Sequence, residues 1–234
     1  MDSSADIAPV DVSCCVILAA GEGRRLSTEN LGRPKPTTEI LGLSLGERIM
    51  LACMAAGVHR FVVVLGSQAD AVRAHFAHAA GQRGCAVDFV TAANWRLGNG
   101  LSTLAARDRV PDARFLLVMA DHLVSPTLIE AVLRAPLGAH DVCLAVDHDI
   151  AQLFDPDDAT KVRVEQGLIR RIGKQLRDWN AVDTGVFLAT PALFDALAHA
   201  TDRGRHALSH GVEALADAEH VRAFPHLRLS CCAC

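Results

Sequence analysis

Short apolar runs alternate along the chain with stretches in which apolar positions recur every three or four residues. The runs predict buried strands at 12–18, 60–65, 87–91, 114–119 and 141–146. The helical spacing predicts helices at 45–56, 69–80, 102–107 and 126–133. Strands and helices that alternate in this way predict an α/β fold, with a Rossmann-like, mostly parallel sheet flanked by helices on both faces.

The pattern changes after residue 159, where shorter strand-like segments follow one another. Two strands are expected around a turn at Gly167, followed by a third strand and two helices, at 160–165, 168–172, 182–188, 191–198 and 207–216. These elements indicate a small antiparallel lid beside the main sheet. The chain is interpreted as a single domain, with a first half at about 12–147, a second lobe at about 148–220 and an atypical tail at 221–234.

The composition argues against several classes of protein. Half of the 234 residues are hydrophobic, but no apolar run approaches the roughly 20 residues that cross a bilayer. Residues 1–8 lack the basic start of a secretory signal, and the net charge of −4 argues against a general nucleic-acid binder. The eight cysteines do not have zinc-site spacing, so we expect free thiols in a reducing cytoplasm.

The first predicted strand ends in a loop of small residues, Ala-Ala-Gly-Glu-Gly at 19–23. Small residues let backbone N–H groups approach phosphate oxygens, so this loop predicts a phosphate-bearing ligand beyond the strand end. Arg24, Arg25 and Lys35 add positive charge nearby. The spacing matches neither the Gly-x-Gly-x-x-Gly dinucleotide pattern nor the P-loop, which ends in Gly-Lys-Ser/Thr.

Two further segments place polar groups just beyond predicted strands. Asn99 lies between Gly98 and Gly100, and its amide, together with the Ser102 hydroxyl, suits recognition of a base or a ribose, although Asn-Gly is also a common turn. Asp121 follows a fully apolar strand. Its carboxylate suits Mg²⁺ that is also bound by triphosphate oxygens.

These motifs, in this order, resemble those of the sugar-phosphate nucleotidyltransferases, which join a nucleoside triphosphate to a phosphorylated sugar or alcohol. Their pattern Leu-Ala-Ala-Gly-x-Gly-x-Arg-Leu, followed by Pro-Lys-Pro, matches residues 18–26 and 34–36. The chain also resembles the CTP:inositol-1-phosphate cytidylyltransferase branch at 98–100, 121–122, 159–164, 172–174 and 182–185, with Ala120 in place of a glycine. The resemblance runs from about residue 12 to about residue 211 and implies a GT-A-like fold with an acceptor-binding lid.

The resemblance also implies a role for each matching residue. Arg25 and Lys35 would neutralise the reacting and leaving phosphates, and Lys174, on the lid, would bridge the acceptor phosphate and the α-phosphate. Asp121 would bind Mg²⁺. The nucleotide would be held by Leu18, Ala19, Ala20, Gly21, Glu22, Gly23, Gly98, Asn99, Gly100 and Ser102. The acceptor would be held by Asp183 and Thr184, and by Lys161 if that residue is not simply a solvated strand lysine.

The implied reaction joins CTP and inositol 1-phosphate to give CDP-inositol and pyrophosphate, with Mg²⁺. The alternative acceptors are phosphocholine, phosphoethanolamine and a sugar 1-phosphate. Choline is disfavoured because it needs an aromatic cage, and the chain has no tyrosine and only two tryptophans. The implied partners are therefore CTP and a phosphorylated polyol or alcohol, without nucleic acid. The resemblance leaves room for a homodimer and for a separate membrane-bound phosphatidyltransferase that uses the product.

One departure from the family concerns the metal. The family has a late Trp-x-Asp-Val-Asp-like segment that supplies a second carboxylate, whereas residues 221–234 contain neither Asp nor Glu. Asp147, Asp149 and Asp183 are candidates for the second metal position without support from a motif. A non-catalytic nucleotide-binding relative is therefore a further alternative.

Overall fold

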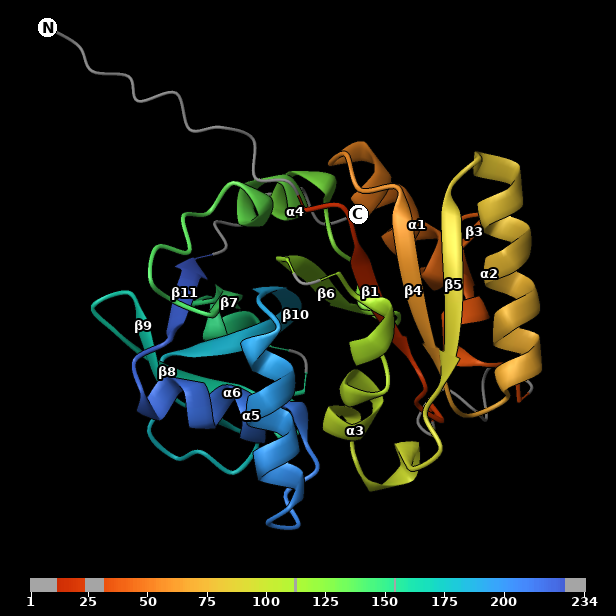
Figure 1. The fold of residues 1–234 in the computed structure, drawn as a ribbon. Coiled ribbons are helices and arrows are strands. Elements are labelled where there is room, and N and C mark those ends of the chain that lie inside the picture. The colour runs from red at the N-terminus through yellow and green to blue at the C-terminus, as the bar shows by residue number, and fades with distance from the viewer. Residues whose placement is uncertain (1–11, 24–31, 112, 154, 226–234) are drawn as a thin grey trace, which may run out of the picture.

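The structure is a computed structural model that describes residues 12–23, 32–111, 113–153 and 155–225. A nine-stranded sheet forms its centre, in the order β5-β4-β1-β6-β10-β7-β11-β9-β8 (Figure 1). The strands are β1 (Cys15–Ala19), β4 (Arg60–Leu65), β5 (Ala86–Thr91), β6 (Phe115–Met119), β7 (Val142–Asp147), β8 (Lys161–Glu165), β9 (Leu168–Gly173), β10 (Ala181–Ala189) and β11 (Val221–Pro225). A separate hairpin pairs β2 (Glu39–Ile40) with β3 (Leu43–Ser44).

Helices cover both faces of the sheet. One layer contains α1 (Leu45–Ala55), α2 (Ala69–Arg83) and α4 (Pro126–Leu133), and the other contains α3 (Asn99–Leu104), α5 (Ala192–Thr201) and α6 (Leu208–Asp217). Alternate residues of β1 face the two layers, with Ile17 in one core and Val16 and Leu18 in the other. Because the strand is buried on both sides, it appears in the sequence as a continuous apolar run.

Helix starts follow local sequence signals. Ser44 and Glu47 form a capping box at the start of α1: the Glu47 N–H donates to Ser44 Oγ at 3.0 Å, and the Ser44 N–H donates to Glu47 Oε2 at 3.1 Å. Ser125 caps α4 by accepting from the Leu128 N–H at 3.2 Å. The predicted fold class and nearly all predicted elements are confirmed, with shifted ends: α2 continues to Arg83, and α3 begins at Asn99.

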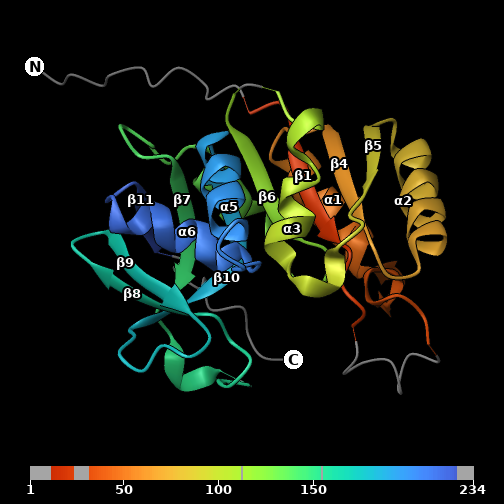
Figure 2. The same ribbon diagram turned by 60° about the horizontal axis from the view of Figure 1, so that its bottom comes forward.

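The predicted lid needs a correction at its third strand. The segment expected there, 182–188, is part of β10. The start of β10 pairs antiparallel with the lid strand β8 through Ala181 and Val182, but most of the strand lies inside the main sheet between β6 and β7 and is antiparallel to both. Its run from Val186 to Ala189 is fully buried, as expected for a strand with a neighbour on each side and helices on both faces. The lid is therefore the β8–β9 hairpin, which projects at one edge of the sheet (Figure 2).

The predicted tail is also partly wrong. Residues 221–225 form β11, which pairs in parallel with β7 and contacts β9 through Arg222. Val221 is fully buried and Ala223 packs on the core, so this segment belongs to the sheet. Residues 226–234 lie outside the described residues. No helix in the described ranges is long and apolar enough to span a membrane.

Candidate active site

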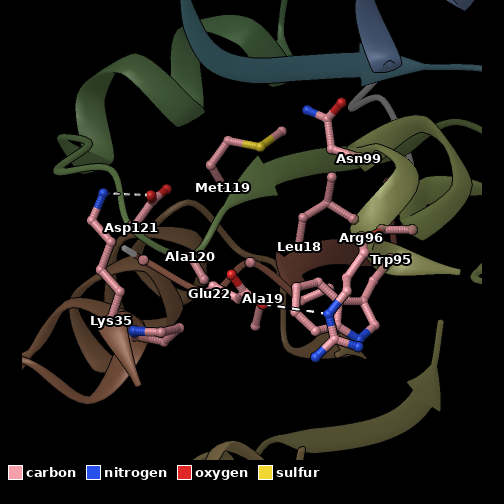
Figure 3. A pocket seen from close by; sticks show the side chains of 15 residues that line it. Leu18, Ala19, Glu22, Lys35, Trp95, Arg96, Asn99, Met119, Ala120 and Asp121 are labelled. Atoms are coloured by element: carbon pink, nitrogen blue, oxygen red, sulfur yellow. Dashed lines mark hydrogen bonds and ion pairs between the residues drawn. The ribbon is translucent and has the colours of Figure 1, made fainter. Parts of the chain in front are cut away.

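A cavity of about 480 Å³ opens beyond the carboxyl ends of β1 and β6 (Figure 3). It is lined by the loop 18–23, by Lys35 and Pro36, by Asn99 and Ser102 with the preceding turn, and by the strand end 119–121. Parallel strands carry their carboxyl ends to the same edge of a sheet, which is where ligands bind in such folds. The three motifs selected from the sequence therefore meet around a space of small-molecule size.

Gly21 and Gly23, the two glycines of this loop, have different structural roles. Gly21 is exposed, and a Cβ built on it would meet no protein atom within 4 Å. Its backbone therefore faces open space, which a ligand can enter. Gly23 has φ +61°, and a Cβ there would lie 2.7 Å from the Cβ of Lys35. Glycine at 23 thus allows both the left-handed turn and the close passage of Lys35.

Lys35 and Asp121 form an ion pair at one end of the cavity (Figure 3). The Lys35 Nζ donates to Asp121 Oδ2 at 2.6 Å, and the two side chains are 29% and 35% exposed. Lys35 opens the 3₁₀ helix η1 (Lys35–Thr37) after Pro34, and Asp121 follows β6. A cation suited to phosphate and a carboxylate suited to a metal ion therefore lie in direct contact with each other.

The other end of the cavity is closed by residues that the sequence reasoning missed. Trp95 and Arg96 belong to the 3₁₀ helix η2 (Trp95–Leu97). The Arg96 guanidinium lies 4.4 Å from the centroid of the Trp95 ring, and its Nε lies 3.4 Å from Glu22 Oε1. In the sequence they lie three and two positions before Gly98, with no motif of their own. They add an aromatic wall that a nucleotide base can pack against.

Gly98 and Gly100 do not line the cavity. A Cβ on either residue would lie within 2.6 Å of the His206 carbonyl oxygen, and the Gly100 N–H donates to that oxygen at 2.9 Å. These glycines are needed where η2 and α3 pack against the segment before α6. The role in holding the nucleotide that the resemblance implies for these two glycines therefore stays a prediction, since their contacts are with the protein.

Asn99 lines the cavity in a fixed orientation. Its Oδ1 accepts from the Leu208 N–H, at the start of α6, at 2.8 Å. Because the oxygen is turned toward α6, the Nδ2 amide remains as the group that can donate to a ligand, and in Figure 3 the nitrogen points over the cavity.

The segment 183–185 forms an irregularity in β10, where its register with β7 shifts. The Asp183 N–H donates to the Thr160 carbonyl at 2.9 Å, and Asp183 Oδ1 accepts from the Gly185 N–H at 2.7 Å. The Thr184 hydroxyl donates to the Ala145 carbonyl at 2.8 Å. The Thr184 hydroxyl has already used its hydrogen, so it can only accept a hydrogen bond from a bound substrate. The Asp183 carboxylate can also accept further hydrogen bonds from a substrate.

His122, directly after Asp121, touches the same segment. Its Nδ1 lies 2.8 Å from the Thr184 carbonyl oxygen, and its Nε2 lies 3.8 Å from Asp121 Oδ1. Burial raises the pKa of Asp183 to about 6, while the Gly185 hydrogen bond and the nearby His122 act in the opposite direction. The predicted metal ligand, Asp121, therefore lies close to the predicted acceptor-binding residues of β10, and His122 lies next to both.

The two lid lysines lie on the β8–β9 hairpin and do not line the cavity. Lys161 donates to the Lys174 carbonyl at 2.9 Å and lies 5.9 Å from the Trp179 ring centroid. The Lys174 Nζ donates to Asp158 Oδ1 at 2.7 Å, with 54% of the Lys174 side chain exposed. A role for Lys174 at the α-phosphate requires it to leave Asp158. Arg25 lies outside the described residues.

The residues around Asp121 fit a divalent ion that the nucleotide helps to bind. Within the described ranges, no group of three or more His, Cys, Asp or Glu side chains is placed to hold an ion without other ligands. Mg²⁺ commonly takes one or two carboxylates and completes its shell with phosphate oxygens and water. One accessible carboxylate at the end of the cavity meets that requirement.

Residues 15–220 match the MobA-like NTP transferase domain. The chain belongs to this family. The nucleotidyltransferase family that the motifs predicted is thus confirmed. In this NTP transferase domain, the motifs predicted to bind the nucleotide lie beyond the carboxyl ends of the parallel strands, around one cavity.

The NTP transferase domain resembles longer proteins. It is 37% identical over 179 residues to the "Bifunctional IPC transferase and DIPP synthase" of Rubrobacter xylanophilus, covering 76% of this chain and 38% of that protein. It is 34% identical over 194 residues to the protein of the same name from Archaeoglobus fulgidus, covering 83% of this chain and 36% of that protein. The chain therefore spans less than two fifths of the length of these curated relatives.

Solved structures agree with this assignment. The inositol-1-phosphate CTP transferase from T. maritima superimposes with a TM-score of 0.82 at 26% identity, covering 92% of this chain and 85% of that one. UDP-glucose pyrophosphorylase complexed with UDP-glucose superimposes with a TM-score of 0.77 at 17% identity, covering 92% and 91%. The second likeness bears on the fold alone, and together they confirm the predicted GT-A-like architecture.

Proposed function

We propose that this NTP transferase domain transfers a cytidylyl group from CTP to inositol 1-phosphate, giving CDP-inositol and pyrophosphate. The observation that carries the proposal is the Lys35–Asp121 pair at the end of a cavity formed by the loop 18–23. The choice of base and acceptor is supported by the names of the relatives and by the five motifs shared with that branch.

The chemistry needs little from the protein beyond positioning and charge neutralisation. An oxygen of the acceptor phosphate attacks the α-phosphorus of CTP, the bond from that phosphorus to the β-phosphate oxygen breaks, and pyrophosphate leaves. The attacking oxygen is already anionic, so no side chain has to remove a proton. Orientation of the two substrates and stabilisation of developing negative charge supply most of the rate enhancement in such transfers.

Lys35 is the residue that would meet the triphosphate first. Its ammonium lies at the end of the cavity, and on nucleotide binding it would exchange its bond with Asp121 for bonds with phosphate oxygens. Asp121 would then hold Mg²⁺, which neutralises phosphate charge when it is bound. Arg25 and Lys174 would add charge at the reacting phosphates from the loop and from the lid.

The nucleoside would lie between the loop and α3. The Asn99 Nδ2 can donate toward the cavity, since the side-chain oxygen is turned toward the Leu208 N–H. Cytosine presents acceptors at O2 and N3, and Ser102 lines the same wall with a hydroxyl. Trp95 would pack against the base or ribose.

The acceptor would lie where β10 begins, beside Asp121. Asp183 would accept hydrogen bonds from polyol hydroxyls, with Thr184 contributing lone pairs and Lys161 contributing positive charge. This arrangement favours inositol over choline, which has no hydroxyl donors of that kind on its cationic end.

A separate membrane-bound phosphatidyltransferase would consume the product. The free thiols of the five described cysteines agree with a reducing cytoplasm.

The test is pyrophosphate release from CTP and Mg²⁺ with inositol 1-phosphate, phosphocholine and glucose 1-phosphate in parallel. Release with inositol 1-phosphate alone supports the proposal. Release only with one of the other two compounds would show that the proposed acceptor is wrong. Asp121→Asn should abolish release, and Asp88→Asn, on a partly buried strand residue that pairs with Arg60, should not. Silence with all acceptors, while CTP still raises the melting temperature, would mean nucleotide binding without catalysis.

A further inference from the structure

Asp121 and His122, just after the end of β6, place two electron-pair donors close together. The nearest atoms are Asp121 Oδ1 and His122 Nε2, 3.8 Å apart. This distance is too long for a hydrogen bond. Asp121 uses its other oxygen, Oδ2, for the Lys35 ammonium.

The Thr184 carbonyl determines which nitrogen of His122 carries hydrogen. A carbonyl oxygen can only accept, so the contact of 2.8 Å requires a hydrogen on Nδ1. In the neutral ring, Nε2 then has a free lone pair, and this nitrogen lies 3.8 Å from Asp121 Oδ1. An imidazole that donates one N–H to a backbone carbonyl while offering the other nitrogen is the usual arrangement of a metal-ligating histidine.

The fold keeps the ring in this place through Gly185. That residue has φ +78°, and a Cβ on it would lie 2.3 Å from His122 Nδ1 and 2.9 Å from Met119 Cγ. The glycine therefore makes room for the imidazole against β10. The His122 side chain is 42% exposed, so an ion can reach the imidazole from solvent.

We propose that His122 Nε2, together with Asp121, binds the catalytic divalent ion and is its second protein ligand. The inference rests on the proposed nucleotidyl-transfer function. Mg²⁺ prefers octahedral geometry with bonds of about 2.1 Å, so two neighbouring ligand atoms of one ion lie about 3.0 Å apart. The observed 3.8 Å therefore has to shorten by about 0.8 Å when the ion binds, which side-chain rotation of the partly exposed Asp121 and His122 can supply.

Two properties follow for the ion. Two protein ligands are too few to hold it firmly, so tight binding requires triphosphate oxygens and depends on CTP. A nitrogen ligand also favours Mn²⁺ or Co²⁺ over Mg²⁺, compared with a site made only of oxygens. His122 thus provides a second ligand without any of the three carboxylates considered from the sequence.

The test uses Mn²⁺ as the probe, with the full chain and CTP in the absence of acceptor. Pulsed electron paramagnetic resonance of the ternary complex should show modulation from a directly bound nitrogen-14. The modulation should change to the nitrogen-15 pattern when the wild-type protein is labelled with nitrogen-15 histidine, a measurement that needs no variant.

Variants assign the nitrogen to His122. His122→Ala should remove the modulation and weaken Mn²⁺ in the ternary complex by about 10- to 100-fold. His140→Ala is the matched control, since that ring also contacts a backbone carbonyl through Nδ1, at 2.8 Å from Leu137 O. His140 lies just before the start of β7, at the opposite end of the strands from the cavity. It should leave both readouts unchanged.

The outcomes separate the two proposals. CTP binding and turnover without nitrogen modulation in the wild type, or with modulation that persists in His122→Ala, would overturn the role of His122 alone. Failure of Mn²⁺ and CTP to bind at all would overturn the proposed function and this inference together.

Discussion

Replacing Gly185 by alanine tests how strongly the β10 irregularity depends on this glycine. The residue has φ +78°, and the added Cβ would lie 2.3 Å from His122 Nδ1. The left-handed backbone costs an L-residue about 1–2 kcal/mol. Displacing the imidazole also breaks its hydrogen bond to the Thr184 carbonyl, which contributes about 0.5–1.5 kcal/mol. Gly185→Ala should therefore lower the free energy of unfolding by about 1.5–3.5 kcal/mol.

Gly204→Ala is the matched control. Gly204 has φ +73°, and a Cβ there would meet no atom within 4 Å. The backbone cost and the effect of alanine on the unfolded chain are then shared, and the difference between the variants isolates the contact with His122. Urea unfolding measures both free energies. Equal losses in the two variants would refute the argument that Gly185 exists to accommodate the imidazole.

Three further predictions concern the site and the fold. Lys35→Ala should lower turnover by about 10²- to 10³-fold, because one charged group at the reacting phosphates is lost; an unchanged rate in the pyrophosphate assay would remove Lys35 from the site. Asp183→Asn keeps an oxygen for the Gly185 N–H, so it should raise the KM for the acceptor and leave CTP affinity unchanged; loss of CTP binding would contradict the lobe assignment. Burial opposes ionisation of Glu47, but hydrogen bonds from Ser44 and the Arg83 guanidinium hold its pKa below the ordinary 4.5. Its charge therefore stabilises the fold above that value, and the stability gap between wild type and Glu47→Gln, measured by urea unfolding, should close as the pH falls through the lowered pKa.

The sequence was most informative where local rules decide the structure. The run 60–65 and the helix from Pro126 to Leu133 appear with the predicted bounds, because apolar periodicity and the Ser125 cap act within a few residues. The strand ends also determine where a ligand can lie in a parallel sheet. The location of the cavity therefore followed from the order of the motifs, and the comparisons confirm the family that they indicated.

The sequence was least informative where contact partners are distant in the chain. An apolar run such as 182–188 is compatible with either a lid strand or a central strand. The position of β10 is determined by its pairing with β6 and β7, which are distant in the sequence. Gly98 and Gly100 were interpreted from their neighbours, whereas their contacts are with His206, more than a hundred positions later. His122 follows Asp121 in the motif, but its value as a ligand depends on the Thr184 carbonyl, which no spacing rule reveals.

The bond between Asn99 and the first turn of α6 has a consequence for how the molecule assembles. It joins residues 109 positions apart, so the helix cannot gain this hydrogen bond until the central part of the chain has folded. We expect α6 to dock late during folding, after β1, β4 and β6 have formed their parallel core. Nucleotide that holds Asn99 in place would then slow the opening of α6 and protect its amides from hydrogen exchange.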